Sequence, residues 1–97
     1  MNEKCLLIEL KRAGLQAEAQ PSITVYYKDE VVGAFVADVI VEDEIILELK
    51  SVRRVVKVHE VQLVNYLTAT GKDVGLIINF AERKVEIKRK VRELAES

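Results

Sequence analysis

Three consecutive segments in the middle of the chain are rich in β-branched and aromatic residues. They cover residues 23–27, 31–41 and 45–49, and short charged stretches separate them. This composition is typical of β-strands, and the short intervals predict that the strands follow one another as a meander. A chain with these segments must build a sheet, and the charged residues inside them must be accommodated there.

Two further segments have the apolar spacing of amphipathic helices. The first begins almost at Met1 and is followed by Gly14, which is placed to end it. The second runs over about residues 58–70, with Gly71 as a stop. Glycine after the last apolar position is a common helix terminator, so we expect helices before and after the three strands.

The remaining part of the chain predicts two more strands and a final helix. Residues 74–80 form a continuous apolar run, as in a buried strand, and residues 85–87 form a shorter one. Residues 90–95 then predict a closing helix. The expected order is α-β-β-β-α-β-β-α in one α/β domain covering residues 1–97.

Composition narrows the classes of function. A hydrophobic content of 49% in 97 residues is enough for one core. The longest apolar stretch is much shorter than the roughly 20 residues of a membrane helix. The start of the chain mixes charges with apolar residues, and Cys5 is the single cysteine, so we expect a soluble, cytoplasmic protein without membrane partners. A formal net charge of -1 means that nucleic acid must be bound by a local patch.

Three charged residues interrupt the second and third apolar strands: Asp38, Glu48 and Lys50. If Glu42 to Glu44 form a three-residue hairpin loop, Asp38 lies directly opposite Glu48 and shares a sheet face with Lys50. A two-residue turn would instead point Asp38 away from Glu48, unless a bulge restored the phase. A site at these residues therefore predicts the three-residue loop.

Two facing carboxylates among apolar neighbours are costly to bury and call for a compensating cation. Mg²⁺, or Mn²⁺, prefers such hard oxygen ligands, so Asp38 and Glu48 are the candidate metal ligands. In metal-assisted phosphodiester hydrolysis, a neighbouring lysine orients water or stabilises developing charge. Lys50 is the candidate for that role. The alternative interpretation is an exposed strand end with an ion pair of little energetic weight.

Polar and basic residues near this cluster are candidates for contacts with substrate. On the second predicted helix, Gln62 and Tyr66 are four residues apart and project from one face, with His59 one turn earlier. Basic residues precede this helix and recur near the end of the chain, and the candidates for nucleic-acid contact are Arg53, Arg54, Lys57, Lys88 and Arg89. A solvated surface is the alternative for these cations.

The residues resemble the PD-(D/E)XK nuclease superfamily. Its core places an Asp and then a Glu-X-Lys on adjacent strands, as in Asp38 and Glu48-Leu49-Lys50 here. The segment Gln62-Leu-Val-Asn-Tyr66 is similar to the Gln-X-X-X-Tyr motif of helicase-associated members. The resemblance implies a restriction-endonuclease-like core with a mixed central sheet flanked by helices, and catalytic roles for Asp38, Glu48, Lys50 and Gln62.

A closer resemblance is to the small GxxExxY family, and it covers almost the whole chain. It rests on segments such as Ala37-Asp-Val, Glu48-Leu-Lys-Ser-Val and Gly75-Leu-Ile-Ile-Asn-Phe80. The Gly-X-X-Glu-X-X-Tyr signature itself lies upstream of the matching region and is absent from this sequence. We therefore expect a shortened first helix without the acid that the superfamily often carries there.

The resemblance implies a metal-dependent nuclease that hydrolyses phosphodiester bonds of DNA. The alternative is a non-catalytic module of the same fold that binds nucleic acid or a protein partner. Such a module could form a homodimer. In that alternative, Asp38, Glu48 and Lys50 form a self-satisfied ion cluster. A divalent ion between the carboxylates favours the nuclease, and a filled, dry site favours the module.

Overall fold

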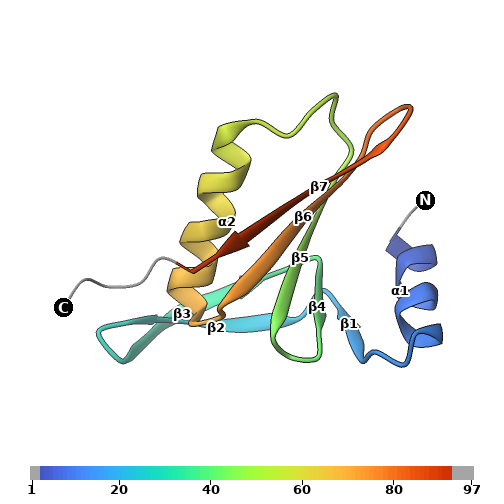
Figure 1. Cartoon of the computed structure of the whole chain (residues 1–97). Helices are drawn as coiled ribbons and strands as arrows, with labels where there is room; N and C mark the ends of the chain where they lie inside the picture. Colours follow the sequence, from blue (N-terminus) through green and yellow to red (C-terminus); the bar gives the residue numbers. More distant parts are fainter. Residues whose placement is uncertain (1–2, 93–97) are drawn as a thin grey trace.

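The computed structural model of the chain describes residues 3–92 (Figure 1). A first helix is followed by five strands, a second helix and two final strands. The elements are α1 Glu3–Arg12, β1 Ala17–Ala19, β2 Ser22–Tyr27, β3 Glu30–Val36, β4 Val39–Val41, β5 Ile45–Lys50, α2 Lys57–Thr70, β6 Val74–Phe80 and β7 Val85–Val91.

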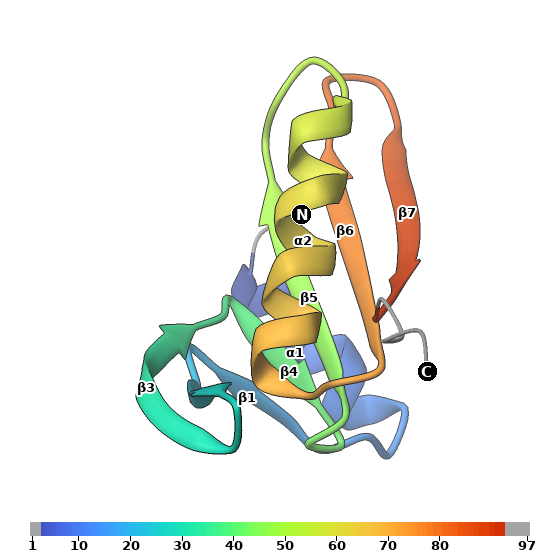
Figure 2. The same cartoon turned by 90° about the vertical axis from the view of Figure 1, so that its left-hand side faces the viewer.

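Five of the strands form the central sheet, in the order β1-β4-β5-β6-β7. Strands β5 and β6 are parallel, and their other neighbours in the sheet are antiparallel. Helix α2 provides the crossover that a parallel pair requires. Strands β2 and β3 form a separate antiparallel pair beside the lower end of α2 (Figure 2). This mixed sheet with flanking helices confirms the predicted fold class.

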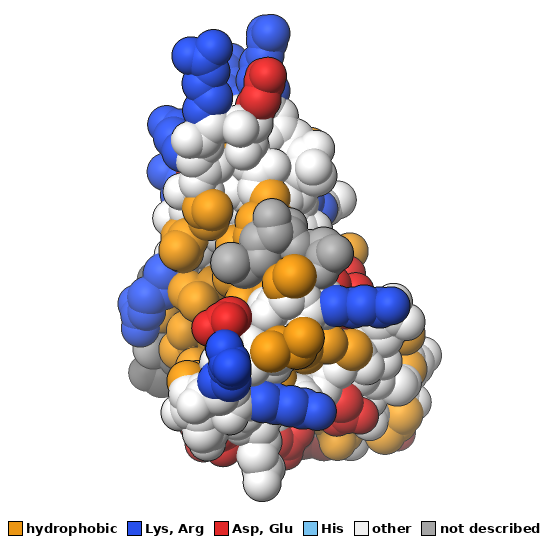
Figure 3. Space-filling model, turned by 90° about the vertical axis from the view of Figure 1, so that its right-hand side faces the viewer, with side chains coloured by type: hydrophobic (Ala, Val, Ile, Leu, Met, Phe, Trp, Pro, Cys, Tyr) orange, Lys and Arg blue, Asp and Glu red, His pale blue; other side chains and the backbone are white. Residues whose placement is uncertain are grey.

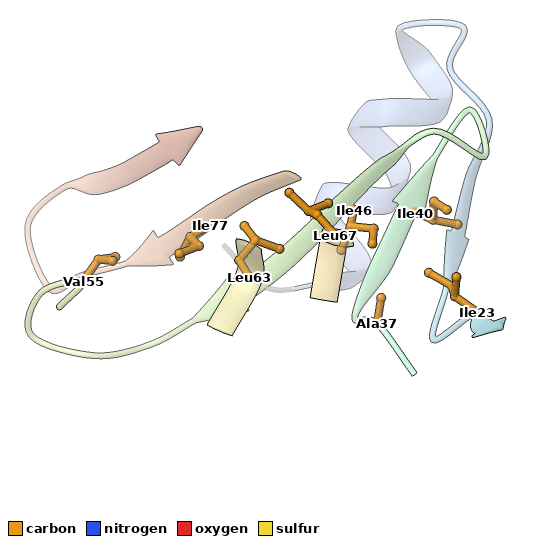
Figure 4. Packing of buried hydrophobic residues seen from close by; sticks show 8 residues of the cluster. All are labelled: Ile23, Ala37, Ile40, Ile46, Val55, Leu63, Leu67 and Ile77. Carbon is orange, nitrogen blue, oxygen red and sulfur yellow. The ribbon is translucent and has the colours of Figure 1, made fainter. Parts of the chain in front are cut away.

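The two helices cover opposite faces of the central sheet (Figure 1). On the α2 face, the side chains of Leu63 and Leu67 pack with Ile46 and Ile77 (Figure 4). On the α1 face, buried residues that include Leu47 pack with apolar side chains of α1. Because successive side chains of a strand point to opposite faces, each strand contributes alternate residues to the two clusters.

Helix α2 approaches the sheet closely because of a glycine in β6. A Cβ atom added to Gly75 would lie only 2.9 Å from a methyl carbon of Leu63, closer than such atoms can pack. The helix ends at Gly71, whose φ of 75° is the left-handed conformation that glycine adopts at little cost. The bounds of α2 and β6 confirm the predicted helix over residues 58–70 and the predicted strand over residues 74–80.

The predicted three-strand meander is wrong in its connections. The apolar stretch over residues 31–41 is not one strand, because the chain bends at Ala37 and Asp38 and divides it into β3 and β4. Strand β3 pairs with β2 in the small sheet, whereas β4 pairs with β5 in the central sheet. Asp38 thus lies at the corner where the chain passes from one sheet to the other.

Both ends of the central sheet also differ from the prediction. Strand β1 was not predicted, because its Ala-Glu-Ala sequence carries no strand signal, and it is held by pairing with β4. The short strand predicted over residues 85–87 continues as β7 to Val91, so Lys90 is in a strand and not in a helix. Val91 is also in β7, and Arg92 is in neither a helix nor a strand. Residues 93–95 of the predicted closing helix lie outside the described residues. Within residues 3–92, neither helix is long and apolar enough to cross a membrane.

Candidate metal and nucleic-acid site

The β4–β5 hairpin has the register that the site requires. Val41 lies opposite Ile45, and Val39 lies opposite Leu47. The loop between them begins with Glu42 and Asp43 in left-handed conformations, with φ of 55° and 56°. The predicted three-residue loop is therefore confirmed. Continuing the register by one residue places Asp38 opposite Glu48.

Hydrogen bonds fix Asp38 at the edge of this hairpin. Its carboxylate Oδ2 accepts a hydrogen bond from the backbone N–H of Leu49 at 2.8 Å. Its backbone carbonyl accepts one from the N–H of Gln20, also at 2.8 Å. These hydrogen bonds therefore hold the Asp38 carboxylate beside Leu49, the residue that follows Glu48.

Glu48 is half-buried, and the pKa of its carboxyl group is strongly raised. Its Oε1 atom is buried and has no hydrogen-bond partner among residues 3–92. The pKa of Glu48 is raised to about 7, first by burial and then by the negative charge of Asp38 and hydrogen bonding to it. The charge of Lys50 acts in the opposite direction and lowers this pKa. A group with an unsatisfied buried oxygen and a pKa near neutrality is a candidate for function.

Lys50 ends β5 on the same sheet face as Glu48, because the two residues are two positions apart in the strand. It is half-buried and lies in register with Asn79 of β6, which in turn pairs with Glu86 of β7. Glu48, two positions earlier in β5, lies opposite the buried Ile77 of β6. The α2 face of the sheet thus changes from apolar to polar toward the carboxyl end of β5.

These side chains meet the requirements for a divalent ion in part. Within residues 3–92, no group of three or more His, Cys, Asp or Glu side chains is placed to hold a metal ion. Mg²⁺ is nevertheless commonly held by one or two carboxylates, with water and substrate phosphate completing its octahedron. Asp38 and the unpartnered Oε1 of Glu48 supply such a donor pair. The residues present therefore fit an ion that keeps several sites for water and substrate.

The helix residues of the predicted site have different surroundings. Gln62 is exposed and, within residues 3–92, makes no hydrogen bond to Asp38, Glu48 or Lys50. The ring of Tyr66 stacks on that of Phe35, with centroids 4.1 Å apart, so it joins α2 to β3. His59 accepts a hydrogen bond through Nδ1 from the N–H of Val56 at 3.2 Å. The structure therefore uses Tyr66 in packing and His59 to cap α2.

The predicted basic residues do not all lie on one face. Arg53 and Arg54 are exposed in the loop between β5 and α2, and Lys57 is the first residue of α2. Lys88 lies opposite the buried Ile77 and so belongs to the α2 face. Arg89 is the next residue of the strand and therefore lies on the opposite, α1 face, away from Asp38 and Glu48. Basic side chains gather at the end of the molecule where the β5–α2 loop and the β6–β7 turn lie (Figure 3).

Two polar residues near the cluster were missed by the sequence-based prediction. Asn79 is fully buried and Glu86 is half-buried, and they hydrogen bond to each other and to the backbone of the β5–α2 loop. The pKa of Glu86 is lowered, first by the hydrogen bond from the Val55 N–H and then by that from Asn79. The available signal was an asparagine inside the apolar strand over residues 74–80.

Fold and site together define a restriction-endonuclease-like core, with an Asp directly before β4 and a Glu-X-Lys on the adjacent strand β5. A sequence model of the PD-(D/E)XK nuclease superfamily matches residues 1–90. The chain belongs to this superfamily. No curated protein matches it in a sequence search.

Solved structures show the same fold. The crystal structure of SSO0001 is similar with a TM-score of 0.69 and 20% identity, over 96% of this chain and 49% of that chain. An alkaline exonuclease (LHK-Exo) from Laribacter hongkongensis is similar with a TM-score of 0.55 and 10% identity, over 93% of this chain and 54% of that chain. The chain thus spans about half the length of each of these two structures.

Proposed function

We propose that this chain is a metal-dependent nuclease domain that hydrolyses phosphodiester bonds of DNA. The observation that carries the proposal is the buried, unpartnered Oε1 of Glu48 beside Asp38, with Lys50 on the same sheet face. Membership of a nuclease superfamily and the fold shared with an exonuclease support it. We also propose that the chain is a member of the GxxExxY family and that it is located in the cytoplasm.

In this proposal, Asp38 and Glu48 are the residues that would hold Mg²⁺ or Mn²⁺. The bound ion would supply Lewis-acid polarisation of a substrate phosphate oxygen. The N–H of Leu49 holds the Asp38 carboxylate in place, so that it does not have to reorganise when substrate arrives. Burial of Glu48 keeps competing water away from its inner oxygen.

Lys50 and the neighbouring basic residues act on the substrate. The ammonium group of Lys50 stabilises the negative charge that develops on the phosphate in the transition state, or orients the attacking water. Gln62 serves as a supporting contact from α2. Arg53, Arg54, Lys57 and Lys88 contact backbone phosphates, which attracts nucleic acid without sequence preference. His59, Tyr66 and Arg89 remain weaker candidates for such contacts.

The test combines metal binding with cleavage. Calorimetric titration of Mg²⁺ and Mn²⁺ into the wild type, Asp38→Asn and Glu48→Gln is followed by plasmid nicking on the same samples. Asp29→Asn, in the exposed β2–β3 turn, is the matched control. Substitution of residues around metal ligands commonly costs 10–100-fold, so we expect loss of a ligand to lower nicking by more than about 100-fold. Nicking by Asp38→Asn at the wild-type rate, or a wild type that binds no ion, would overturn the proposal.

A non-catalytic interaction module is the second candidate. Two observations favour it: the absence of a third acidic ligand within residues 3–92, and the exposed apolar side chains of β7. On the α1 face, part of β7 is not covered by α1. Three apolar side chains there are each more than half exposed: Val85, Ile87 and Val91. This surface is suited to a protein partner or a second copy of the chain. An inactive wild type that binds no metal and sediments as a dimer would support this candidate.

A further inference from the structure

A second polar cluster lies beside the proposed metal site, on the same face of the sheet. It consists of Asn79 on β6, Glu86 on β7, and the backbone of Val52 and Val55 in the loop between β5 and α2. None of these groups is needed to hold an ion. Their hydrogen bonds instead fix the loop that follows Lys50.

Asn79 binds the loop in the way that a neighbouring strand would. Its Oδ1 accepts a hydrogen bond from the N–H of Val52 at 2.9 Å, and its Nδ2 donates one to the carbonyl of Val52, also at 2.9 Å. Asn79 has no exposed surface, so these bonds are shielded from water. Val52 follows Lys50 by two residues. Asn79 therefore fixes the backbone directly after the proposed catalytic cation.

Glu86 continues this arrangement at the far end of the loop. Its Oε1 accepts hydrogen bonds from the N–H of Val55 at 2.8 Å and from Nδ2 of Asn79 at 3.3 Å. The side chain of Val55 is buried at the end of the apolar cluster under α2 (Figure 4). The loop is thus attached at both of its ends, while Arg53 and Arg54 between them remain exposed.

The same hydrogen bonds join two basic segments of the chain. Glu86 is the second residue of β7 and follows the β6–β7 turn, which carries Arg83 and Lys84. Both turn cations are exposed, with Glu82 as the acidic residue beside them. Basic side chains gather at the end of the molecule formed by the loop and the turn, beside acidic atoms (Figure 3). Backbone phosphates are the chemical partner that such a surface fits.

We propose that Asn79 and Glu86 form a clamp that holds Arg53, Arg54, Arg83 and Lys84 as one phosphate-binding surface at the end of the sheet. This inference rests on the proposed function for its partner, a DNA duplex. Asn79 and Glu86 are positioning residues, because they reach the substrate only through the loop and the turn. Nucleic acid would then run from this surface past Lys50 toward Asp38 and Glu48.

Amide hydrogen exchange tests the clamp independently of any activity. We expect the Val52 amide in Asn79→Ala, and the Val55 amide in Glu86→Ala, to exchange about tenfold faster than in the wild type, since each loses one hydrogen bond. Glu86→Gln keeps an acceptor oxygen and should restore protection of Val55. Asn65→Ala, at an exposed position of α2, is the control. Unchanged exchange at both amides would overturn the clamp.

A double-mutant cycle tests its role in DNA binding. Affinity for a short labelled DNA duplex is measured in EDTA at fixed salt for the wild type, N79A, R53A/R54A and the combined variant. If Asn79 acts through the arginines, N79A lowers affinity about tenfold alone but less than twofold when they are absent, because coupled residues are not additive. E86A should behave in the same way and also reduce the salt dependence of binding.

The outcomes separate this inference from the proposed function. Additive losses in the cycle would show that Asn79 has only a general structural role, and would overturn the clamp as a positioning device. A wild type that does not bind duplex DNA would overturn the proposed substrate and this inference together. Protected Val52 and Val55 amides in the same sample would then assign the clamp to loop structure alone.

Discussion

Two glutamates on the same face of the central sheet have opposite environments. Glu48 on β5 has a buried oxygen without a partner among the described residues, and its pKa is raised to about 7. Glu86 on β7 accepts two hydrogen bonds, and its pKa is lowered. Buried polar groups are normally satisfied, so the cluster around Glu86 is typical of structure and that around Glu48 of function. The comparison predicts that substitutions in the two clusters change stability in opposite directions.

The largest expected effect on stability is in the satisfied cluster. Asn79→Ala leaves the N–H and carbonyl of Val52 without partners and removes one hydrogen bond from Glu86. A buried group without its partner costs about 1–3 kcal/mol, so we expect the free energy of unfolding to fall by about 2 kcal/mol. Urea denaturation measures it, with Asn65→Ala as the exposed control. A loss no greater than that of the control would contradict the comparison.

Glu48→Gln should have the opposite effect in the absence of metal. Replacing a partly buried carboxylate beside Asp38 removes charge repulsion and a desolvation cost. The expected gain at pH 8 in EDTA is about 1 kcal/mol, because the partial exposure of Glu48 allows solvent to screen the interaction. Saturating Mg²⁺ should stabilise the wild type and leave the variant unchanged. If the variant is less stable than the wild type in EDTA, Glu48 has a structural role.

The pH dependence of stability gives a third test. The pKa of Glu48 is about 7 in the folded state, against the ordinary glutamate value of 4.5. The folded protein therefore holds the additional proton between these values, and this contribution to stability is lost as pH rises through 7. In EDTA, the difference in Tm between Glu48→Gln and the wild type should grow from pH 5 to pH 8. Parallel curves would show that Glu48 is ionised throughout.

The smallest effect is expected at Glu86. Its pKa is lowered in the folded state, so its ionised form contributes stability above the ordinary glutamate pKa of 4.5. This contribution is lost as pH falls through the folded pKa. Glu86→Gln should lower Tm slightly at neutral pH, and the difference should disappear on strong acidification. Between pH 5 and pH 8 its curve should parallel that of the wild type, in contrast to Glu48→Gln. A difference that grows with pH in this range would remove the distinction between the two glutamates.

The sequence alone predicted the pairing of Asp38 with Glu48 on the condition of a three-residue loop, and the observed β4–β5 register meets that condition. Strand residues alternate between faces, and a loop of three residues after Val41 fixes which residues lie opposite one another. Helix α2 and strand β6 were also predictable, because their apolar patterns and the glycine between them are local signals. These features depend on residues that are close together in the sequence.

Only the tertiary structure decided how the strands are distributed and what surrounds the site. The bend at Ala37 and Asp38 is held by hydrogen bonds from Ala37 to Pro21 and from Gln20 to Asp38, and no local signal marks it. The length of β7 depends on pairing with β6, and the role of Asn79 depends on a loop 27 positions earlier. These contacts join distant parts of the chain, and their energies arise only after the sheet has formed.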